Sequence, residues 1–350
     1  MNRFTEETLP AEAGDQRRQE LLEVFKRCVL TAPQLRAKKV VQRPKLLGEW
    51  LRKGDLGFIF APRGRGKTWF GMAVAKALAQ GAPAKLACWE ADQPQTVLYV
   101  DGEMALDDTQ ARELGLGEET ERLKFLHHTM IFEEAEQTLN LTEKSAQNAI
   151  TDLLIQTKAD CLVLDNLSSL FYGLKENEND SWEVVLPWLL ELRRRGITII
   201  IIHHAGTNET RMRGATKRED AAHWVIRLDA SVNGDAEEGA QFCTSFTKCR
   251  NCAKRPEPIE FLFKPSGLKL GKIDVSFSIV DALERFRICI RDQRLSTASE
   301  IAEETGQSKG YVSRLAHKAR AEGWCIIQDR HYQYSPQGDP KLDPSLPHPF

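Results

Sequence analysis

An apolar run at residues 58–60 leads directly into a glycine-containing turn that ends in Gly-Lys-Thr and opens a segment of helical character. Gly64 and Gly66 let the backbone N–H groups of this turn converge on an anion. Lys67 can then reach the terminal phosphates of a nucleotide, and the Thr68 hydroxyl can hold Mg²⁺ at the positive end of the helix. The sequence therefore predicts a strand, a phosphate-binding turn and a helix, in the order that binds a nucleoside triphosphate.

The turn occupies residues 61–68 and the expected helix residues 69–80. Ala61 stands at the first motif position, where most such turns have glycine, so the backbone there must accommodate a Cβ. The expected cofactors are ATP and Mg²⁺, with Thr68 as one metal ligand. The residues expected to contact the nucleotide are Arg63, Gly64, Arg65, Gly66, Lys67, Thr68 and Trp69.

The composition is typical of a soluble globular protein. The 350 residues suffice for two or three domains, and 41% of them are hydrophobic. No apolar run approaches the length needed to cross a bilayer, and residues 1–19 are mostly polar, so a cytoplasmic protein is expected. The net charge of −2 argues against a uniformly basic surface but allows local basic clusters.

Eight cysteines are scattered at irregular spacing, which favours reduced and mostly buried thiols. Cys249 and Cys252 form a CxxC pair that could begin a zinc site, but no second pair completes it. Cys243 and Cys249 are six residues apart in an expected strand, so we expect them on one strand face. The spacing therefore favours ordinary packing over metal binding.

Residues 1–42 are predicted to form an N-terminal helical segment. An acidic start is followed by one amphipathic helix at residues 16–30. Its apolar stripe needs a partner, which is either the protein's own core or a neighbouring subunit. The stripe consists of Leu21, Leu22, Phe25, Cys28 and Val29.

Residues 43–272 alternate short β-rich runs with helical segments, which predicts an α/β domain with crossover helices. Near-continuous apolar runs, such as residues 197–202, indicate central strands covered on both faces. The expected strands are residues 56–60, 97–101, 123–127, 161–165, 197–203, 223–229, 241–248 and 259–263.

The alternation stops after residue 272, and residues 273–335 are predicted to form a small winged helix-turn-helix domain. We expect the final residues, 336–350, to be disordered because they are rich in proline and polar residues. The expected elements are helices at residues 275–292, 298–305 and 308–322 and a hairpin joining residues 324–327 to 331–334.

Two acidic residues come at the ends of expected strands, on the edge of the sheet where ligands of open α/β folds bind. Asp165 follows the apolar residues 161–164 and is predicted to hold Mg²⁺ together with Thr68. Glu103 follows residues 97–101 and is predicted to orient the attacking water. The alternative for each is an ordinary acid that ends a strand.

The isoleucine-rich strand ends in His203 and His204. Neighbouring strand residues face opposite ways, so only one imidazole is expected to face the phosphates, and we favour His204 as a sensor of the γ-phosphate. The alternative is a pair of histidines with ordinary hydrogen bonds.

Lys248 and Arg250 are two residues apart in an expected strand, so both project from one face and can offer two cations to a phosphate. Supplied from a second subunit, they would act as an arginine finger and stabilise charge in the transition state. The alternative is a basic edge strand whose charge prevents aggregation.

These motifs together resemble the RecA/DnaB-type ATPases, and most closely the plasmid RepA-type hexameric helicases with their phage and mobile-element relatives. The resemblance covers about residues 43–270. It implies a RecA-like P-loop core in a ring, with ATP between subunits, Glu103 as the catalytic carboxylate, and Lys248 and Arg250 reaching a neighbour. Its specific pieces are residues 66–69, 99–104, 164–166, 203–206, 213–220 and 246–250.

Two basic clusters predict contacts to DNA. The first lies in the stretch 207–218 with a single acid, Glu209, and suits phosphates of single-stranded DNA in a ring channel. The second lies in the expected recognition helix, where residues 307–320 contain no acid. The alternatives are a solvated loop and a winged helix that binds protein. The residues concerned are Arg211, Arg213, Lys217, Arg218, Lys309, Arg314 and Lys318.

The resulting functional hypothesis is a DNA-dependent ATPase of the RecA/DnaB class, expected as a hexameric ring, that acts as a helicase in replication of a plasmid, phage or mobile element. The alternative is a DNA-binding regulator or loader in which ATP switches assembly without unwinding. A third possibility is a recombination-type filament.

Overall fold

The chain divides into two compact units, Met1–Gln42 and Arg43–Phe350. The computed structural model describes residues 11–173, 179–206, 212, 215–231, 239–266, 271–305 and 307–340. The domain boundaries expected within the second unit stay a prediction.

The first unit contains helices α1 (Ala11–Cys28) and α2 (Ala32–Ala37). Thr31 caps α2 and forms a capping box with Gln34, which satisfies backbone donors at the start of this short helix. The apolar stripe expected in residues 16–30 lies mostly on α1, where Phe25 is 58% exposed. The residues of this unit that the structure describes give the stripe no apolar cover.

The second unit is built on a nine-stranded sheet with the order β13-β12-β11-β10-β3-β9-β8-β6-β7. The strands from β10 to β7 run parallel, whereas β11, β12 and β13 pair antiparallel at the other end. The α/β class expected from the sequence is confirmed. The strands are β3 (Leu56–Ala61), β6 (Val97–Asp101), β7 (Leu123–His127), β8 (Cys161–Asp165), β9 (Thr198–His204), β10 (Trp224–Ala230), β11 (Ala240–Cys249), β12 (Ile259–Pro265) and β13 (Ile273–Ile279).

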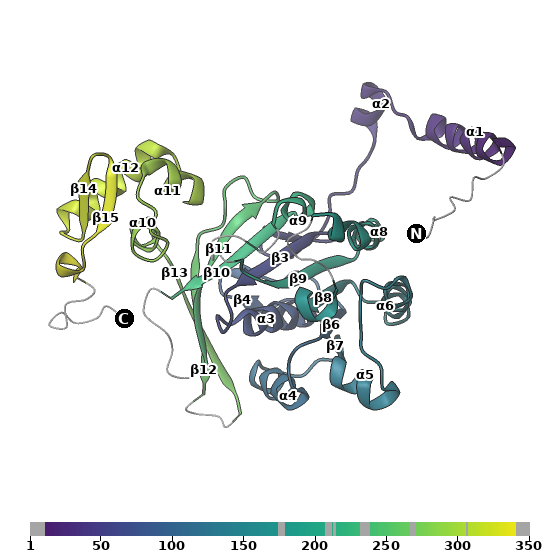
Figure 1. The fold of residues 1–350 in the computed structure, drawn as a ribbon, viewed down its shortest axis with the longest axis horizontal. Helices are drawn as coiled ribbons and strands as arrows, with labels where there is room; N and C mark the ends of the chain where they lie inside the picture. The colour runs from purple at the N-terminus through teal and green to yellow at the C-terminus, as the bar shows by residue number, and fades with distance from the viewer. Residues whose placement is uncertain are drawn as a thin grey trace, which may run out of the picture. The chain divides into compact units, whose positions relative to one another are not determined.

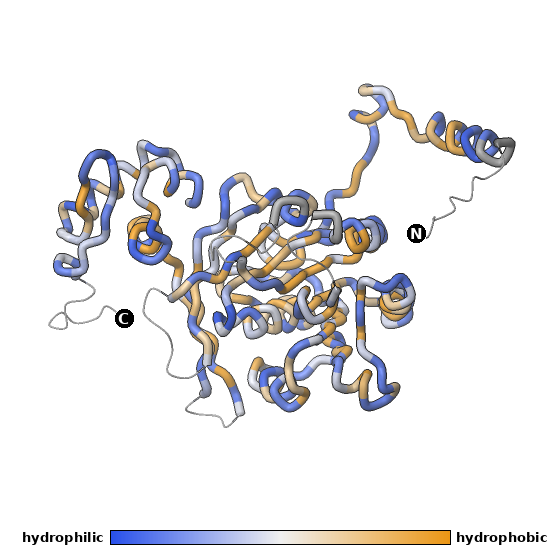
Figure 2. Tube along the Cα trace, in the orientation of Figure 1, coloured by the Kyte–Doolittle hydropathy of each residue, from blue (hydrophilic) through white to orange (hydrophobic). Residues whose placement is uncertain are grey.

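Helices cover both faces of this sheet (Figure 1). Ile199 and Ile201 of β9 belong to one buried apolar cluster with α6 and α8, and Ile200 and Ile202 belong to a second with α3. The central strands are accordingly hydrophobic along their length (Figure 2). The helices are α3 (Lys67–Gln80), α4 (Leu106–Gly115), α5 (His128–Ala135), α6 (Lys144–Gln156), α7 (Leu167–Leu170), α8 (Leu186–Arg194) and α9 (Ala215–Ala221), with a 3₁₀ helix η1 (Asn179–Val184).

The C-terminal region has its own buried cluster, which includes Phe286, Ile301, Val312 and Trp324. It consists of α10 (Ala282–Arg291), α11 (Ala298–Thr305), α12 (Lys309–Ala321) and the hairpin β14 (Cys325–Gln328) with β15 (His331–Tyr334), followed by η2 (Pro336–Gly338). Three helices and a hairpin were expected here, while the winged-helix assignment itself stays a prediction. Residues 341–350, expected as a tail, lie outside the described residues.

The helix expected at residues 275–292 is wrong in its first part. Residues 275–279 belong to strand β13, which pairs with β12, and the helix begins only at Ala282, after the N-cap Asp281. Val275, Phe277 and Ile279 alternate with serines, the period of a strand, and all three are exposed on this edge strand.

Four short strands were not expected from the sequence: β1 (Lys45–Leu47), β2 (Leu51–Arg52), β4 (Lys85–Leu86) and β5 (Trp89–Glu90). They form two separate hairpin-like pairs beside the main sheet. No helix in the described part of the chain is long and apolar enough to cross a membrane.

Cys243 and Cys249 do not share a strand face, contrary to the expectation. The register of β11 against β10 shifts between the partners Val225 and Ile226, and this β-bulge reverses the alternation of side chains. Cys243 therefore packs with the C-terminal helix α10, whereas Cys249 packs against the cluster that contains α3. The spacing rule failed because it assumed a regular strand.

Candidate nucleotide-binding site

The phosphate-binding turn connects β3 to α3, as the sequence predicted. Gly64 and Gly66 have φ of +75° and +83°, a left-handed conformation that residues with a Cβ rarely adopt. A Cβ at Gly66 would also lie 2.7 Å from the Phe242 ring. Ala61 ends strand β3, so its Cβ is accommodated in ordinary strand geometry. The turn is therefore shaped to present its N–H groups to an anion.

Lys67, the second residue of the Gly-Lys-Thr sequence, folds back over this turn. Its Nζ donates hydrogen bonds to the backbone oxygens of Pro62 (2.8 Å) and Ala61 (3.3 Å). Burial lowers the pKa of Lys67, while the charges of Asp165 and Glu103 act in the opposite direction. Lys67 thus lies close enough to both carboxylates to share one site with them.

Asp165 is buried at the end of β8, where the Tyr99 hydroxyl donates to its Oδ2 at 2.6 Å. Burial raises the pKa of Asp165 to about 6, although hydrogen bonds from Tyr99 and Thr68 oppose the shift. Thr68 and Asp165 are therefore in contact, as expected of two residues that hold one cation. Their oxygen donors are the type that Mg²⁺ prefers.

Glu103 is exposed just beyond β6, and the Asn166 side-chain amide donates a hydrogen bond to its Oε2. The same amide nitrogen is 3.4 Å from Nε2 of His204. Asn166 thus joins Glu103 to His204, a role that the sequence did not reveal, although the residue directly follows Asp165. His204, the imidazole favoured from the sequence, is the one that lies beside Asn166, which contacts Glu103.

Asp101, also unassigned from the sequence, fixes the backbone that carries Glu103. Its Oδ1 accepts the N–H groups of Glu103 and Met104, each at 3.0 Å, and the Thr109 hydroxyl donates to its Oδ2 at 2.8 Å. The sequence signal available for Asp101 was its position as the last residue of an expected strand. In the structure it pairs in register with Asp165.

The remaining residues expected at the nucleotide lie around the turn. Arg63 is exposed, Arg65 and Trp69 are half-buried, and the Arg112 guanidinium stacks on the Trp69 ring at 4.9 Å. The left-handed glycines, the buried lysine and the Thr68–Asp165 pair fit a nucleoside triphosphate with its divalent cation. The roles of individual residues stay predictions.

Lys248 and Arg250 lie away from this turn. The Lys248 ammonium donates to the backbone oxygen of Glu219, and Arg250 Nη2 donates to that of Asp220 at 3.0 Å, so both cations contact the end of α9. Burial lowers the pKa of Lys248, and the neighbouring Arg250 adds to the effect. As expected, the two side chains lie on one side of the strand.

Arg218 is not part of an exposed loop, contrary to the expectation. It lies in α9 with 1% exposure, where Nη1 is 3.1 Å from Nε2 of His203 and the guanidinium stacks on Trp182 at 5.3 Å. A guanidinium buried in this way is not available to DNA phosphates in this conformation. The sequence did not reveal the burial of Arg218, because its partners His203 and Trp182 lie outside the basic stretch.

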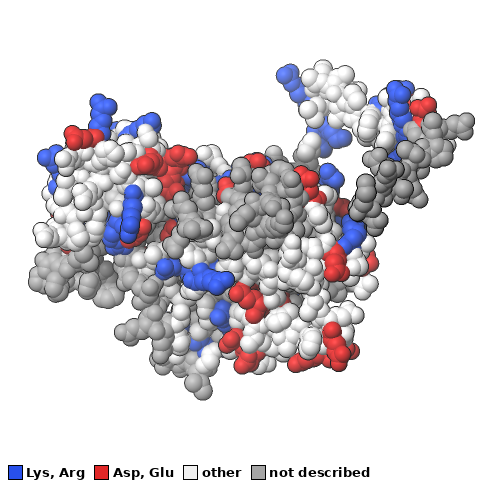
Figure 3. Space-filling model, in the orientation of Figure 1, with Lys and Arg blue, Asp and Glu red and all other residues white. Residues whose placement is uncertain are grey.

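Of the other expected DNA contacts, Arg211, Arg213 and the side chain of Lys217 lie outside the described residues. Those of α12 are exposed on one basic helix: Lys309, Arg314 and Lys318. Lysine and arginine side chains are visible over the C-terminal region in Figure 3.

The fold and this site define a RecA-type P-loop ATPase. A family model described as an AAA domain matches residues 24–210, more than half of the chain. The protein belongs to this AAA domain family, which indicates that it binds and hydrolyses a nucleotide.

Among solved structures, the chain is similar to a KaiC-like protein from the hyperthermophilic archaeon Pyrococcus horikoshii OT3. The identity is 19% and the TM-score 0.47, over 68% of this chain and 100% of that chain. A comparison with curated proteins found no match.

Proposed function

We propose that the protein is a DNA-dependent ATPase of the RecA/DnaB class, assembled as a ring, that acts as a helicase on single-stranded DNA during replication of a plasmid, phage or other mobile element. ATP with Mg²⁺ binds at the P-loop of one subunit, held by Lys67, Thr68 and Asp165. Glu103 orients the attacking water, and His204 responds to the γ-phosphate through Asn166. Lys248 and Arg250 of the next subunit stabilise charge in the transition state.

One observation carries this proposal: the paired cations and the P-loop are at opposite edges of the sheet. β10 pairs in parallel with β3, and Cys249 at the end of β11 pairs with Trp224, which pairs with Gly57 at the start of β3. Arg250 thus lies level with the beginning of β3, about 17 Å along the strand from its P-loop end. That gap exceeds the reach of an arginine side chain, so a phosphate role requires a second copy.

Mixing two inactive variants tests the shared site. Lys67→Ala removes the cradle of one subunit, and Arg250→Ala removes a cation supplied to its neighbour. Each variant alone is expected to lose at least about 100-fold in ATPase rate. In an equal mixture that assembles at random, about a quarter of the interfaces combine the intact P-loop of an Arg250→Ala subunit with the intact Arg250 of a Lys67→Ala subunit. Activity is therefore expected to return to about a quarter of the parent rate. A mixture as inactive as its components would contradict a site shared between subunits.

The helicase step is tested separately with a forked duplex. Exposed cations on α12 support binding to DNA phosphates, and single-stranded DNA is expected to accelerate ATP hydrolysis. The parent protein then displaces the labelled strand in the presence of ATP, whereas Lys67→Ala does not. ATP hydrolysis on DNA without any strand displacement would favour the alternative function, an ATP-switched regulator or loader.

A further inference from the structure

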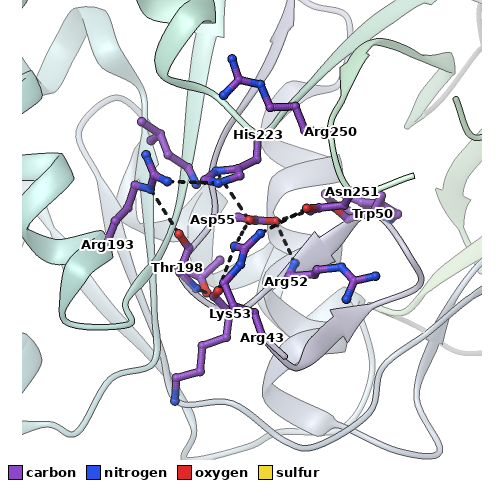
Figure 4. Close-up of polar contacts among 12 residues, drawn as sticks. Arg43, Trp50, Arg52, Lys53, Asp55, Arg193, Thr198, His223, Arg250 and Asn251 are labelled. Carbon is purple, nitrogen blue, oxygen red and sulfur yellow. Dashed lines mark hydrogen bonds and ion pairs between the residues drawn. The ribbon is translucent and has the colours of Figure 1, made fainter. Parts of the chain in front are cut away.

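A buried carboxylate lies at the edge of the sheet opposite the P-loop. Asp55, between β2 and β3, has no exposed side-chain surface. Its Oδ2 accepts hydrogen bonds from the Asn251 amide (2.6 Å) and from the backbone N–H of Arg52 (2.8 Å), and the Arg43 guanidinium pairs with Oδ1. Figure 4 shows Asp55 at the centre of these contacts. A buried charge is tolerated only with such donors, and nucleotide binding does not use this one.

The Asp55 contacts converge on the residue that follows Arg250. The Asn251 amide donates to Asp55 and also to the backbone oxygen of Trp50 at 2.7 Å, while its Oδ1 accepts from Arg43 at 3.3 Å. Both the oxygen and the nitrogen of this side-chain amide therefore have hydrogen-bond partners. The chain at residue 251 is held against the start of β3.

The Arg250 backbone is held from the other side as well. Its N–H donates to the His223 oxygen at 2.8 Å, and the His223 ring lies against Asp55, with Nδ1 3.5 Å from Oδ1. The Arg250 side chain, by contrast, is exposed, and in the described part of the chain it donates a hydrogen bond to an uncharged backbone oxygen, that of Asp220. A fixed backbone thus carries a cation whose present partner is weaker than a phosphate would be.

We propose that Asn251 and Asp55 are positioning residues: they fix the end of β11 so that Arg250, with Lys248, projects toward the triphosphate of a neighbouring copy. This inference rests on the proposed function. A displacement of about 1 Å in a group that stabilises a transition state can cost about 100-fold in rate. Loss of the Asn251 contacts acts on turnover and leaves the P-loop of the same subunit intact.

The test combines Asn251→Ala with Arg250→Ala in a double-mutant cycle on the full-length protein. Single-turnover hydrolysis of labelled ATP keeps slow rates measurable, and a fluorescent ATP analogue reports nucleotide affinity. Asn251→Ala is expected to lower the hydrolysis rate by about 10–100-fold with less than about a threefold change in affinity. In the Arg250→Ala background, the same substitution is expected to have less than about a threefold further effect, because nothing remains to be positioned.

Asn140→Ala is the matched control, because Asn140 is also a largely buried asparagine that accepts local hydrogen bonds, from Thr142. It is expected to leave the hydrolysis rate within about threefold of the parent, whatever its effect on thermal stability. Asn251→Ser is the second variant should Asn251→Ala fail to fold, because its hydroxyl keeps a polar group at this position without adding a charge. Its single donor cannot serve both Asp55 and the Trp50 backbone oxygen, so a loss of turnover in the same direction is expected.

The outcomes separate this inference from the proposed function. An equal fold-loss from Asn251→Ala in both backgrounds would show a purely structural role and overturn the inference, as would an unchanged rate. A parental rate in Arg250→Ala alone would instead overturn the shared site, and the positioning role with it.

Discussion

At the scale of single residues, the two carboxylates of the site differ in their surroundings, which suit the separate tasks that we propose for them. Asp165 is buried beside Thr68 and Tyr99, whereas Glu103 is exposed and held only through Asn166. The first arrangement suits a fixed metal ligand and the second a group that meets water. Substitution should therefore affect the two residues differently.

Glu103→Gln is expected to bind ATP with parental affinity and to hydrolyse it about 100- to 10,000-fold more slowly, because the amide cannot accept a proton from water. Affinity is measured by equilibrium titration and turnover by phosphate release. Glu119→Gln, at an exposed position, is the control and retains the parental rate. An unchanged rate in Glu103→Gln would remove this residue from the mechanism.

The acid sensitivity of the fold is expected to depend in part on His223. Burial lowers the pKa of His223 to about 4; Asp55 opposes this, and the charges of Arg193, Arg43 and Arg250 add to it. The folded protein keeps this imidazole neutral at pH values where the unfolded chain, with a pKa near 6.5, binds a proton. Its contribution to stability is thus present above about pH 6.5 and is lost as the pH falls toward 4.

Replacing His223 by glutamine removes this titration. The free energy of unfolding of His223→Gln is expected to fall less between pH 7 and pH 4.5 than that of the parent, by up to about 3 kcal/mol. Urea unfolding at the two pH values measures the difference, with His317→Gln, an exposed position on α12, as the control. Equal pH slopes in parent and His223→Gln would contradict the assignment.

The residues discussed above differ in how far their positions could be predicted from neighbouring residues in the sequence. Lys67, Thr68, Glu103 and Asp165 could be predicted because each follows a strand at a spacing that fixes its place on the sheet edge. Asn251 could not, since its role depends on contacts far away in sequence, to Asp55 and Arg43. Contacts between residues so far apart depend on how the chain packs, and they produce no periodic pattern in the sequence.

At the scale of elements, strands covered on both faces were predicted to within two residues, because their apolar runs are unambiguous. β13 was missed because its alternating residues directly precede a true helix and were included in that helix. The bulge in β11 was missed for a different reason: the residues around it give no sign that the register between β10 and β11 shifts there. Element type followed from sequence for the buried strands and for the edge strand β7, and failed at β13 on the opposite edge.

A cluster of charged residues connects the C-terminal helix α11 to β10, the strand that lies beside the P-loop strand β3. Arg227 of β10 is 1% exposed and pairs with Asp229 and with Glu304 of α11. Burial alone would lower the pKa of Arg227, but these two carboxylates outweigh it and raise the pKa. Because Arg227 pairs in register with Phe60, just before the P-loop, this cluster joins α11 to the nucleotide-binding half of the sheet.

Arg227→Met is expected to lower the free energy of unfolding by about 3 kcal/mol, because two carboxylates lose their buried partner. Amide hydrogen exchange in α11 should rise as that helix loses its attachment to β10. Exposed Arg122→Met is the control, and both variants are compared by urea unfolding and exchange. Parental exchange in α11 of Arg227→Met would show that this cluster does not hold the helix.

At the scale of the whole molecule, the proposed site shared between copies would make activity depend on assembly. A subunit carries its P-loop at one edge of the sheet and Lys248 and Arg250 at the other, so under this proposal it needs a neighbour to complete the site. Within the first unit taken by itself, the apolar side chains of Phe25 and Val29 are exposed, so they need a partner either elsewhere in the chain or on a neighbouring subunit. The separation of the P-loop from the paired cations is the feature that favours a protein working as an assembly.

The specific ATPase rate is therefore expected to fall as the protein is diluted below the concentration at which it assembles, because separated subunits lack the cations of a neighbour. Light scattering across the same dilution series gives the mass, with and without ATP and single-stranded DNA. A closed ring reaches one finite mass that does not grow with concentration, whereas a filament continues to grow. A protein that is monomeric throughout and retains its full specific rate would contradict the shared site, because each subunit would then complete hydrolysis with its own residues.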